Sequence, residues 1–343
     1  MKKRIAREYL YLSVQSRKRR KGVRMKNNSS KSLCYFFLVF FIGMCFFSLC
    51  LWLYYRFNNA CPAYFGYPIM LMPAAACMVS KLLKEGRRTP AFRFYLFFLL
   101  VVAILAVIIA VELFLSIHTE KICTRFLIGA SIAGYIFLRS LPEQKRLKAG
   151  LSIKTADRKR LLLCIFLSIF LFALLTRLKF LIHYLETKDT QFLSIPAAHW
   201  GQLPLFVIDF FLTYIIFFGE EYGWRYFLQP ALCEKYGNIK GILILGIIWS
   251  FYHAPMDFII SQAPPYAFLF RFVLCISLAF YMGWAYIYTH NIWLIAFIHY
   301  LNNSMIALWD APEVPNDSFY LHILAYAIVF LPFAFTKTLR NRS

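Results

Sequence analysis

The sequence is poor in acidic residues, and several common catalytic signatures are missing from it. It holds 16 Asp and Glu against 38 Lys and Arg, a formal net charge of +22. No Gly-rich phosphate loop, Ser-centred nucleophile motif, HExxH zinc motif, internal repeat or low-complexity tract occurs. In a soluble domain this charge would indicate nucleic acid. Here the basic residues cluster in short loops between apolar runs, so membrane topology explains them better and no nucleic-acid partner is expected.

The cysteines also lack a pattern. Their number is odd, and no pair has the CxxC spacing of a metal site. They are interpreted as small apolar fillers. The nine are Cys34, Cys45, Cys50, Cys61, Cys77, Cys123, Cys164, Cys233 and Cys275.

Hydrophobic residues dominate what is present, at 61% of the chain, with aromatics at 19%. This composition predicts an all-α, polytopic transmembrane helix bundle of about eight to ten spans. Of ten apolar runs, the second is the weakest because Pro73 breaks it. No cleavable signal peptide is evident, because the first run begins late and is long enough to span. The runs are 33–54, 67–83, 94–117, 122–138, 161–176, 205–232, 239–258, 266–288, 292–309 and 319–335.

Loop charges predict the orientation. The loops 81–93, 139–160, 233–240 and 337–342 are net basic, which places them and both termini in the cytoplasm of a multi-pass cell-membrane protein. The loop 177–202 would then be extracytoplasmic, as an interfacial helix or lid. The predicted divisions are a basic, disordered cytoplasmic tail (1–32), N-terminal transmembrane helices (33–200), core helices (201–310) and a last helix with a short basic tail (311–343).

Three ionisable residues interrupt the apolar run around position 220. Such residues persist at membrane depth mainly where they face a protein interior or a water-filled cavity. Glu221 and Arg225 stand at i and i+4, which favours a helical ion pair. Glu220 lies about 100° further round the helix and is expected to face elsewhere. A carboxylate without a local cation is suited to general base catalysis.

Two later segments offer polar partners for Glu220. They are WSFYH, from Trp249 to His253, and HYLNN, from His299 to Asn303. In each segment the end residues are four apart, so on a helix they share one face. Three helices could therefore bring a Glu, two His and an Asn to one cavity.

In this order, EEYGWR, WSFYH and HYLNN resemble the EExxxR, FxxxH and HxxxN motifs of the CPBP family. These are the CAAX-processing and bacteriocin-processing or self-immunity membrane proteases, also called the Abi family. The resemblance covers about 203–308, and the first 200 residues contribute nothing to it. Trp249 stands where the family usually has Phe, and Tyr226 stands where it often has Gly.

The resemblance implies an intramembrane endopeptidase. Glu220 would activate a water, His253 would orient it, and His299 and Asn303 would hold substrate or stabilise the oxyanion. Glu221 and Arg225 would support the helix. Zn²⁺ bound by His253, His299 and Glu220 is possible, but the metal-free mechanism is favoured because Glu220 cannot readily be both ligand and free base.

The implied substrate is a peptide or protein at the lipid bilayer, either a CAAX-like prenylated tail or a bacteriocin or pheromone precursor. The alternatives are a non-catalytic immunity or scaffold protein with the same fold, and a proton-coupled transporter. No inverted repeat of the kind found in many transporters is present.

Five further residues carry weaker expectations. Asp209 lies three turns before Glu220 on the same face and could line the same cavity. Glu112 is predicted to be interfacial and His290 to be solvated in a turn. Trp249 and Trp224 are interpreted as packing or interface aromatics.

Overall fold

The computed structural model describes residues 26–155, 157–193, 202–308 and 319–340 of the 343-residue chain. Within these ranges every regular element is a helix and no strand occurs, so the predicted all-α class is confirmed. The longer helices are α2 (Lys26–Asn58), α3 (Tyr67–Glu85), α4 (Phe92–Leu115), α5 (Glu120–Ser140), α7 (Arg158–Thr187), α8 (Leu203–Glu221), α10 (Asn238–Pro255), α11 (Ala267–Thr289), α12 (Ile292–Leu308) and α13 (Phe319–Phe330). The shorter ones are α6 (Glu143–Lys148), α9 (Gln229–Tyr236) and α14 (Lys337–Arg340), with 3-10 or π segments η1 (Ala63–Gly66), η2 (Gly86–Arg88), η3 (Thr190–Leu193), η5 (Tyr222–Leu228), η6 (Met256–Ile260) and η8 (Leu331–Phe335).

The chain is a multi-pass membrane protein. Within the described ranges, seven helices are long and apolar enough to cross a membrane: α2, α3, α4, α5, α7, α10 and α11. Three further apolar helices, α8, α12 and α13, contain 19, 17 and 12 residues. Each of the ten predicted apolar runs coincides with a helix. The side of the membrane on which the termini lie stays a prediction. The predicted basic tail 1–32 lies largely outside the described residues, and α2 already begins at Lys26.

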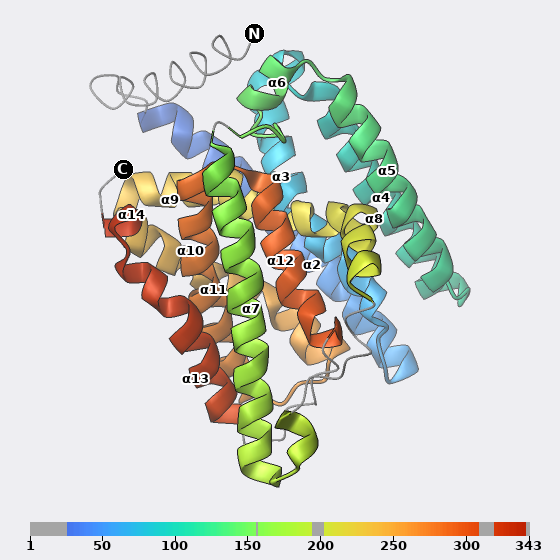
Figure 1. The fold of residues 1–343 in the computed structure, drawn as a ribbon. Coiled ribbons are helices and arrows are strands. Elements are labelled where there is room, and N and C mark those ends of the chain that lie inside the picture. The colour runs from blue at the N-terminus through green and yellow to red at the C-terminus, as the bar shows by residue number, and fades with distance from the viewer. Residues whose placement is uncertain (1–25, 156, 194–201, 309–318, 341–343) are drawn as a thin grey trace.

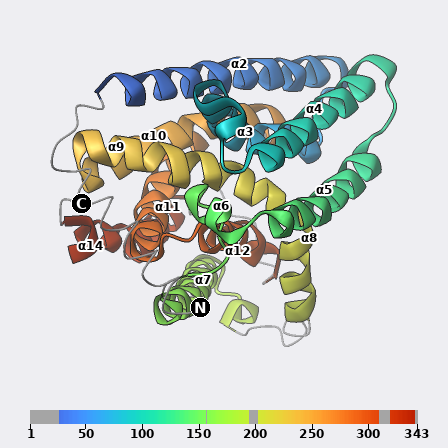
Figure 2. The same ribbon diagram turned by 90° about the horizontal axis from the view of Figure 1, so that it is seen from above.

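The helices form one bundle (Figure 1). Seen from above in Figure 2, α2 runs along one edge and α7 lies near the opposite edge, with α9 and α10 between them. The continuous element α8–η5–α9, which carries EEYGWR, is contacted by α3 and α12, and its α9 segment by α10. This element is called the motif helix below.

Helix α3 continues unbroken through Pro73, which is buried, so the weakest predicted run is a complete helix. The motif helix approaches it closely at two glycines. A Cβ at Gly223 would lie 2.3 Å from the Pro73 carbonyl carbon, and one at Gly219 would lie 2.8 Å from the Met70 oxygen. Only a residue without a side chain allows this approach. The N-terminal half therefore supports the motif helix although it carries none of the motifs.

A second support comes from the chain that follows α6. The Tyr222 hydroxyl donates to the Ala149 carbonyl at 2.7 Å, and the Trp293 indole donates to the Leu151 carbonyl at 3.1 Å. These bonds attach one segment to both the motif helix and α12, which fixes the relative position of the two helices that carry Glu221 and His299.

The first part of the predicted loop 177–202 is helical instead. Helix α7 extends to Thr187, well beyond the apolar run 161–176, and η3 follows it. Residues 194–201 lie outside the described part of the chain. The helix begins where Asp157 accepts a hydrogen bond from the Arg160 backbone N–H, a typical N-cap. All nine cysteines are free, and seven of them are at least half-buried, in agreement with a packing role.

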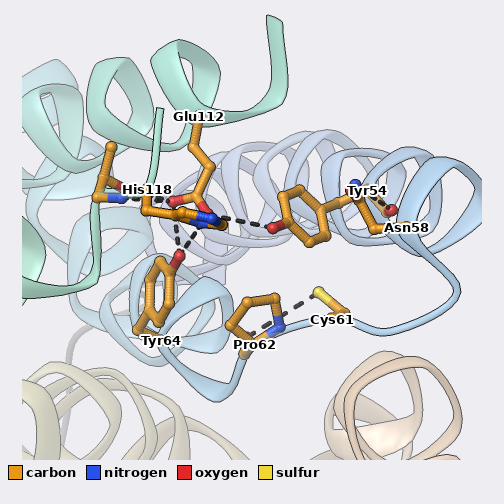
Figure 3. Close-up of polar contacts among 8 residues, drawn as sticks. Tyr54, Asn58, Cys61, Pro62, Tyr64, Glu112 and His118 are labelled. Atoms are coloured by element: carbon orange, nitrogen blue, oxygen red, sulfur yellow. Dashed lines mark hydrogen bonds and ion pairs between the residues drawn. The ribbon is translucent and has the colours of Figure 1, made fainter. Parts of the chain in front are cut away.

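Glu112 lies near the end of α4 and is 2% exposed. Its predicted position at the membrane interface stays a prediction. Tyr54 and Tyr64 donate to its carboxylate, and so do the backbone N–H and hydroxyl of Thr119 (Figure 3). These donors come from α2, η1 and the α4–α5 connection, and sequence spacing alone does not show that they meet.

Candidate active site

The site begins at the junction between α8 and the π-helical segment η5. Helix α8 ends at Glu221, and the π turn starts at the next residue. Short π segments inside helices are frequent at functional sites. Because Gly219 and Gly223 face α3, the two glutamates between them are directed toward α10 and α12. A second π segment, η6, begins three residues after His253.

Glu220, Glu221 and His299 form the centre of the site. Both glutamates are 0% exposed and His299 is 3% exposed. One potential ligand atom from each lies within 4.8 Å of the other two. Glu221 Oε1 accepts a hydrogen bond from His299 Nδ1 at 2.8 Å. Glu220 and Glu221 bond to different helices, Glu220 to Trp249 of α10 and Glu221 to His299 of α12, yet both carboxylates lie close to the His299 imidazole.

Arg225 provides the charge that offsets this acidic pair. Its Nε lies 3.4 Å from Glu221 Oε2, so the predicted i,i+4 ion pair is present. Its guanidinium also lies over the Trp249 ring, 4.8 Å from the ring centroid. Arg225 is itself 0% exposed. A buried charge is tolerated when it is paired, so Arg225 and the carboxylates stabilise one another.

Trp249 is a direct partner of Glu220. Its indole N–H donates to Glu220 Oε2 at 2.9 Å, and its backbone carbonyl accepts a hydrogen bond from His253 Nδ1 at 2.8 Å. Its interpretation as a packing aromatic missed the first of these contacts. The available signal was the residue type, since Trp brings an N–H donor to a position where Phe is usual.

His253 stands beside the centre and is not part of the close group. It is half-buried, and its ring centroid lies 5.7 Å from that of Trp249. The predicted set of Glu220, His253 and His299 is thus replaced by a group in which Glu221 takes the place of His253. Both imidazoles are held through Nδ1. That bond assigns the proton to Nδ1 and leaves Nε2 available to a ligand.

Three other candidates do not join the centre. Asn303 is exposed and accepts a hydrogen bond from the neighbouring Asn302 side chain at 3.0 Å. Asp209 is exposed and accepts from the Tyr300 hydroxyl at 3.1 Å. His290 is exposed at a left-handed turn, as expected for a solvated residue.

Several buried polar atoms at the centre have no direct hydrogen bond. Among the described residues these include Glu220 Oε1, Glu221 Oε2 and the Tyr252 hydroxyl. The Tyr252 hydroxyl interacts with the Glu220 carboxylate without meeting the geometry of a direct bond. Buried unpaired polar atoms are rare in proteins and are often found where a site binds water, an ion or substrate. Here such atoms belong to residues of one buried site.

The donor set fits a metal ion poorly, although two carboxylates and an imidazole are ordinary ligands. Glu220 Oε2 is engaged by the Trp249 N–H, and Glu221 Oε2 faces the Arg225 guanidinium at 3.4 Å. A guanidinium that close to a ligand carboxylate repels a divalent cation. The geometry favours a site in which Arg225 already supplies the positive charge.

Comparison with known proteins agrees with the geometry. The model of a protein family described as Type II CAAX prenyl endopeptidase Rce1-like matches residues 199–305, which contain every residue of the centre. The predicted resemblance to CPBP membrane proteases is confirmed over this segment. No curated protein and no solved structure matches the chain.

Proposed function

We propose that this protein is an intramembrane endopeptidase, which hydrolyses a peptide bond of a membrane-associated peptide or protein with a water activated by Glu220. One observation carries the proposal. A fully buried Glu220–Glu221–His299 group lies in a multi-pass membrane protein, within the segment that matches a membrane endopeptidase family.

The reaction needs a base, an attacking water and donors for the developing oxyanion. Glu220 Oε1 takes a proton from the water as its oxygen attacks the peptide carbonyl carbon. The resulting tetrahedral oxyanion is stabilised by neighbouring donors, of which the Tyr252 hydroxyl lies beside Glu220. The C–N bond then breaks, and Glu220 returns the proton to the leaving amine. A carboxylate, a water and these donors are sufficient, and no metal enters any step.

The other residues have supporting roles. Glu221 fixes the His299 ring through Nδ1, and Arg225 offsets the paired carboxylates. His253, held by the Trp249 carbonyl, orients the water through Nε2. Asn303 is exposed, so its proposed role is limited to a substrate segment that lies outside the buried centre.

The preferred substrate is a CAAX-type prenylated tail, because the matching family is described as a CAAX prenyl endopeptidase. A bacteriocin or other peptide precursor is the second candidate. The proposed location is the cell membrane with the N-terminus in the cytoplasm, an orientation that follows from the basic loops.

The test compares membranes that contain wild-type protein with membranes that contain Glu220→Gln. Both are incubated with an S-farnesylated CAAX peptide and a peptide precursor, and the products are identified by mass spectrometry. We expect an endoproteolytic product from one of these peptides with the wild-type protein and none with the variant. Equal cleavage by both would refute the role of Glu220. A phenotype in cells that survives Glu220→Gln would favour a scaffold, and uptake that tracks pH would favour a transporter.

A further inference from the structure

Trp249 makes contacts with several residues of the site, and a packing role alone would not require them. Its indole N–H donates to Glu220, its ring lies against Arg225, and its edge-on contact with His299 has a centroid distance of 5.5 Å. Its carbonyl holds the ring of His253. The side chain is 2% exposed, so none of these contacts competes with solvent.

The N–H group is the part of Trp249 that a phenyl ring would not supply. Phe, usual at this motif position, could keep the ring contacts with Arg225 and His299 and would leave the backbone carbonyl unchanged. It could not donate to Glu220 Oε2. A hydrogen bond to a carboxylate is stronger than one between neutral groups, particularly in a dry interior. The Trp249 N–H therefore fixes the carboxylate plane of Glu220.

The consequence concerns the second oxygen of Glu220. Oε2 is held by Trp249, and Oε1 is buried without a direct hydrogen bond from any described residue. Fixing the first oxygen therefore fixes the direction of the second, which keeps its capacity to accept a hydrogen bond. A base must be held within hydrogen-bond reach of the proton that it removes.

We propose that Trp249 is a positioning residue that aims Oε1 of Glu220 at the attacking water. This inference rests on the proposed endopeptidase function and adds a residue to which the motif comparison assigns no polar role. Trp249 acts through Glu220 and touches neither water nor substrate in this mechanism. Its contribution is therefore to the rate of the chemical step and not to substrate binding.

Trp224 offers a matched control. Like Trp249 it is fully buried. Its ring packs against that of Tyr252, with centroids 5.4 Å apart. Its indole nitrogen has no hydrogen-bond partner among the described residues. Trp224→Phe therefore removes the same atoms from the same region as Trp249→Phe, but breaks no hydrogen bond.

The experiment measures cleavage of an S-farnesylated CAAX peptide by the full-length protein in detergent micelles, for wild type, Trp249→Phe, Trp224→Phe and Glu220→Gln. We expect Trp249→Phe to lower kcat about 10- to 100-fold with KM unchanged, which corresponds to the loss of one hydrogen bond to a charged group. Trp224→Phe should keep the wild-type kcat. Glu220→Gln should be inactive.

A thermal unfolding cycle gives a readout that needs no substrate. Wild type, Trp249→Phe, Glu220→Ala and the double variant are compared, because Ala removes the acceptor that Gln would retain, and we expect the two shifts in Tm to be non-additive because one contact joins the two side chains. Additive shifts, or equal kcat for Trp249→Phe and Trp224→Phe while Glu220→Gln is inactive, overturn the role of Trp249 and leave the proposed function intact. Full activity of Glu220→Gln, or failure of the wild type to cleave both the S-farnesylated CAAX peptide and the peptide precursor, overturns both.

Discussion

Among the described residues, Glu112 and the pair Glu220 and Glu221 are buried in separate places, and these two places differ in how the carboxylate oxygens are satisfied. Glu112 receives hydrogen bonds from two tyrosines and from both donors of Thr119 (Figure 3), and both of its oxygens are used. His118 Nδ1 lies 3.7 Å from its Oε1, and the His118 side chain is 92% exposed. Glu220 and Glu221 each keep one oxygen without a hydrogen bond from the described residues.

The difference separates an anchor from a site of chemistry. A buried carboxylate is costly, and surrounding it with donors is the common way to offset that cost. At Glu112 the hydrogen-bond donors satisfy both carboxylate oxygens, and they connect α2, η1 and the α4–α5 connection. At Glu220 and Glu221 the compensation is partial, because one oxygen of each carboxylate has no hydrogen bond from the described residues. We infer that Glu112 stabilises the fold and that the motif acids carry the reaction.

Glu220→Gln is expected to have the largest effect on activity. Loss of a general base lowers the rate about 100- to 10 000-fold. The Gln amide can still accept the Trp249 hydrogen bond, so Tm should stay close to that of wild type. The rate is measured as cleavage of the S-farnesylated CAAX peptide, and Tm is measured in detergent. A variant that loses activity only because it unfolds would contradict the assignment.

Glu112→Gln makes the same chemical change in the other centre. The new amide N–H groups face the donors of Tyr64 and Thr119, so at least one hydrogen bond to a charged group is lost, at a cost of about 1.5–3 kcal/mol of unfolding free energy. We expect a lower Tm with kcat retained at temperatures where the variant is folded. A loss of kcat with an unchanged Tm would reverse the roles of the two centres.

These roles were only partly predictable from the sequence. The i,i+4 spacings and the three motifs identified Glu220, Glu221, Arg225 and His299, because helical periodicity and charge at membrane depth can be read from one chain. The close group of Glu220 and His299 is completed by Glu221 and not by His253. This outcome depends on the π turn after Glu221 and on how three helices pack. Neither has a signature in local spacing.

Glu112 shows the same limit in another form. Its burial depends on donors from segments far apart in sequence, so local spacing does not predict that the protein encloses its carboxylate. Trp249 differs, since its N–H was visible in the sequence and only its partner was not. Pro73 is unfavourable inside a helix, yet α3 is continuous through it, and Gly223 of the motif helix packs closely against it.

A pair of Tyr→Phe substitutions sharpens the comparison with a smaller effect. Tyr64→Phe removes a donor from Glu112, so we expect a loss of about 1.5 kcal/mol in unfolding free energy and an unchanged kcat. Tyr252→Phe breaks no direct hydrogen bond to a described residue, so its Tm should stay near wild type. Its kcat should fall about 10-fold, because a donor to the developing oxyanion is lost. Circular dichroism melts and steady-state kinetics on the same preparations check both, and identical behaviour of the two variants would remove the distinction between the centres.

The smallest effect is expected from metal removal. The Arg225 guanidinium stands 3.4 Å from Glu221 Oε2 and the Trp249 N–H occupies Glu220 Oε2, so one oxygen of each carboxylate is already engaged and a positive charge already lies beside the pair. Incubation with EDTA or 1,10-phenanthroline should therefore leave cleavage of the S-farnesylated CAAX peptide unchanged, and metal analysis of active protein should find less than one equivalent.

Arg225→Met under the same conditions is the informative companion, since removing the guanidinium leaves two carboxylates and an imidazole able to bind a divalent ion. Zn²⁺ should then raise the Tm of Arg225→Met and not that of wild type. Inhibition of the wild type by both chelators, reversed by added Zn²⁺, would show that the metal-free mechanism is wrong.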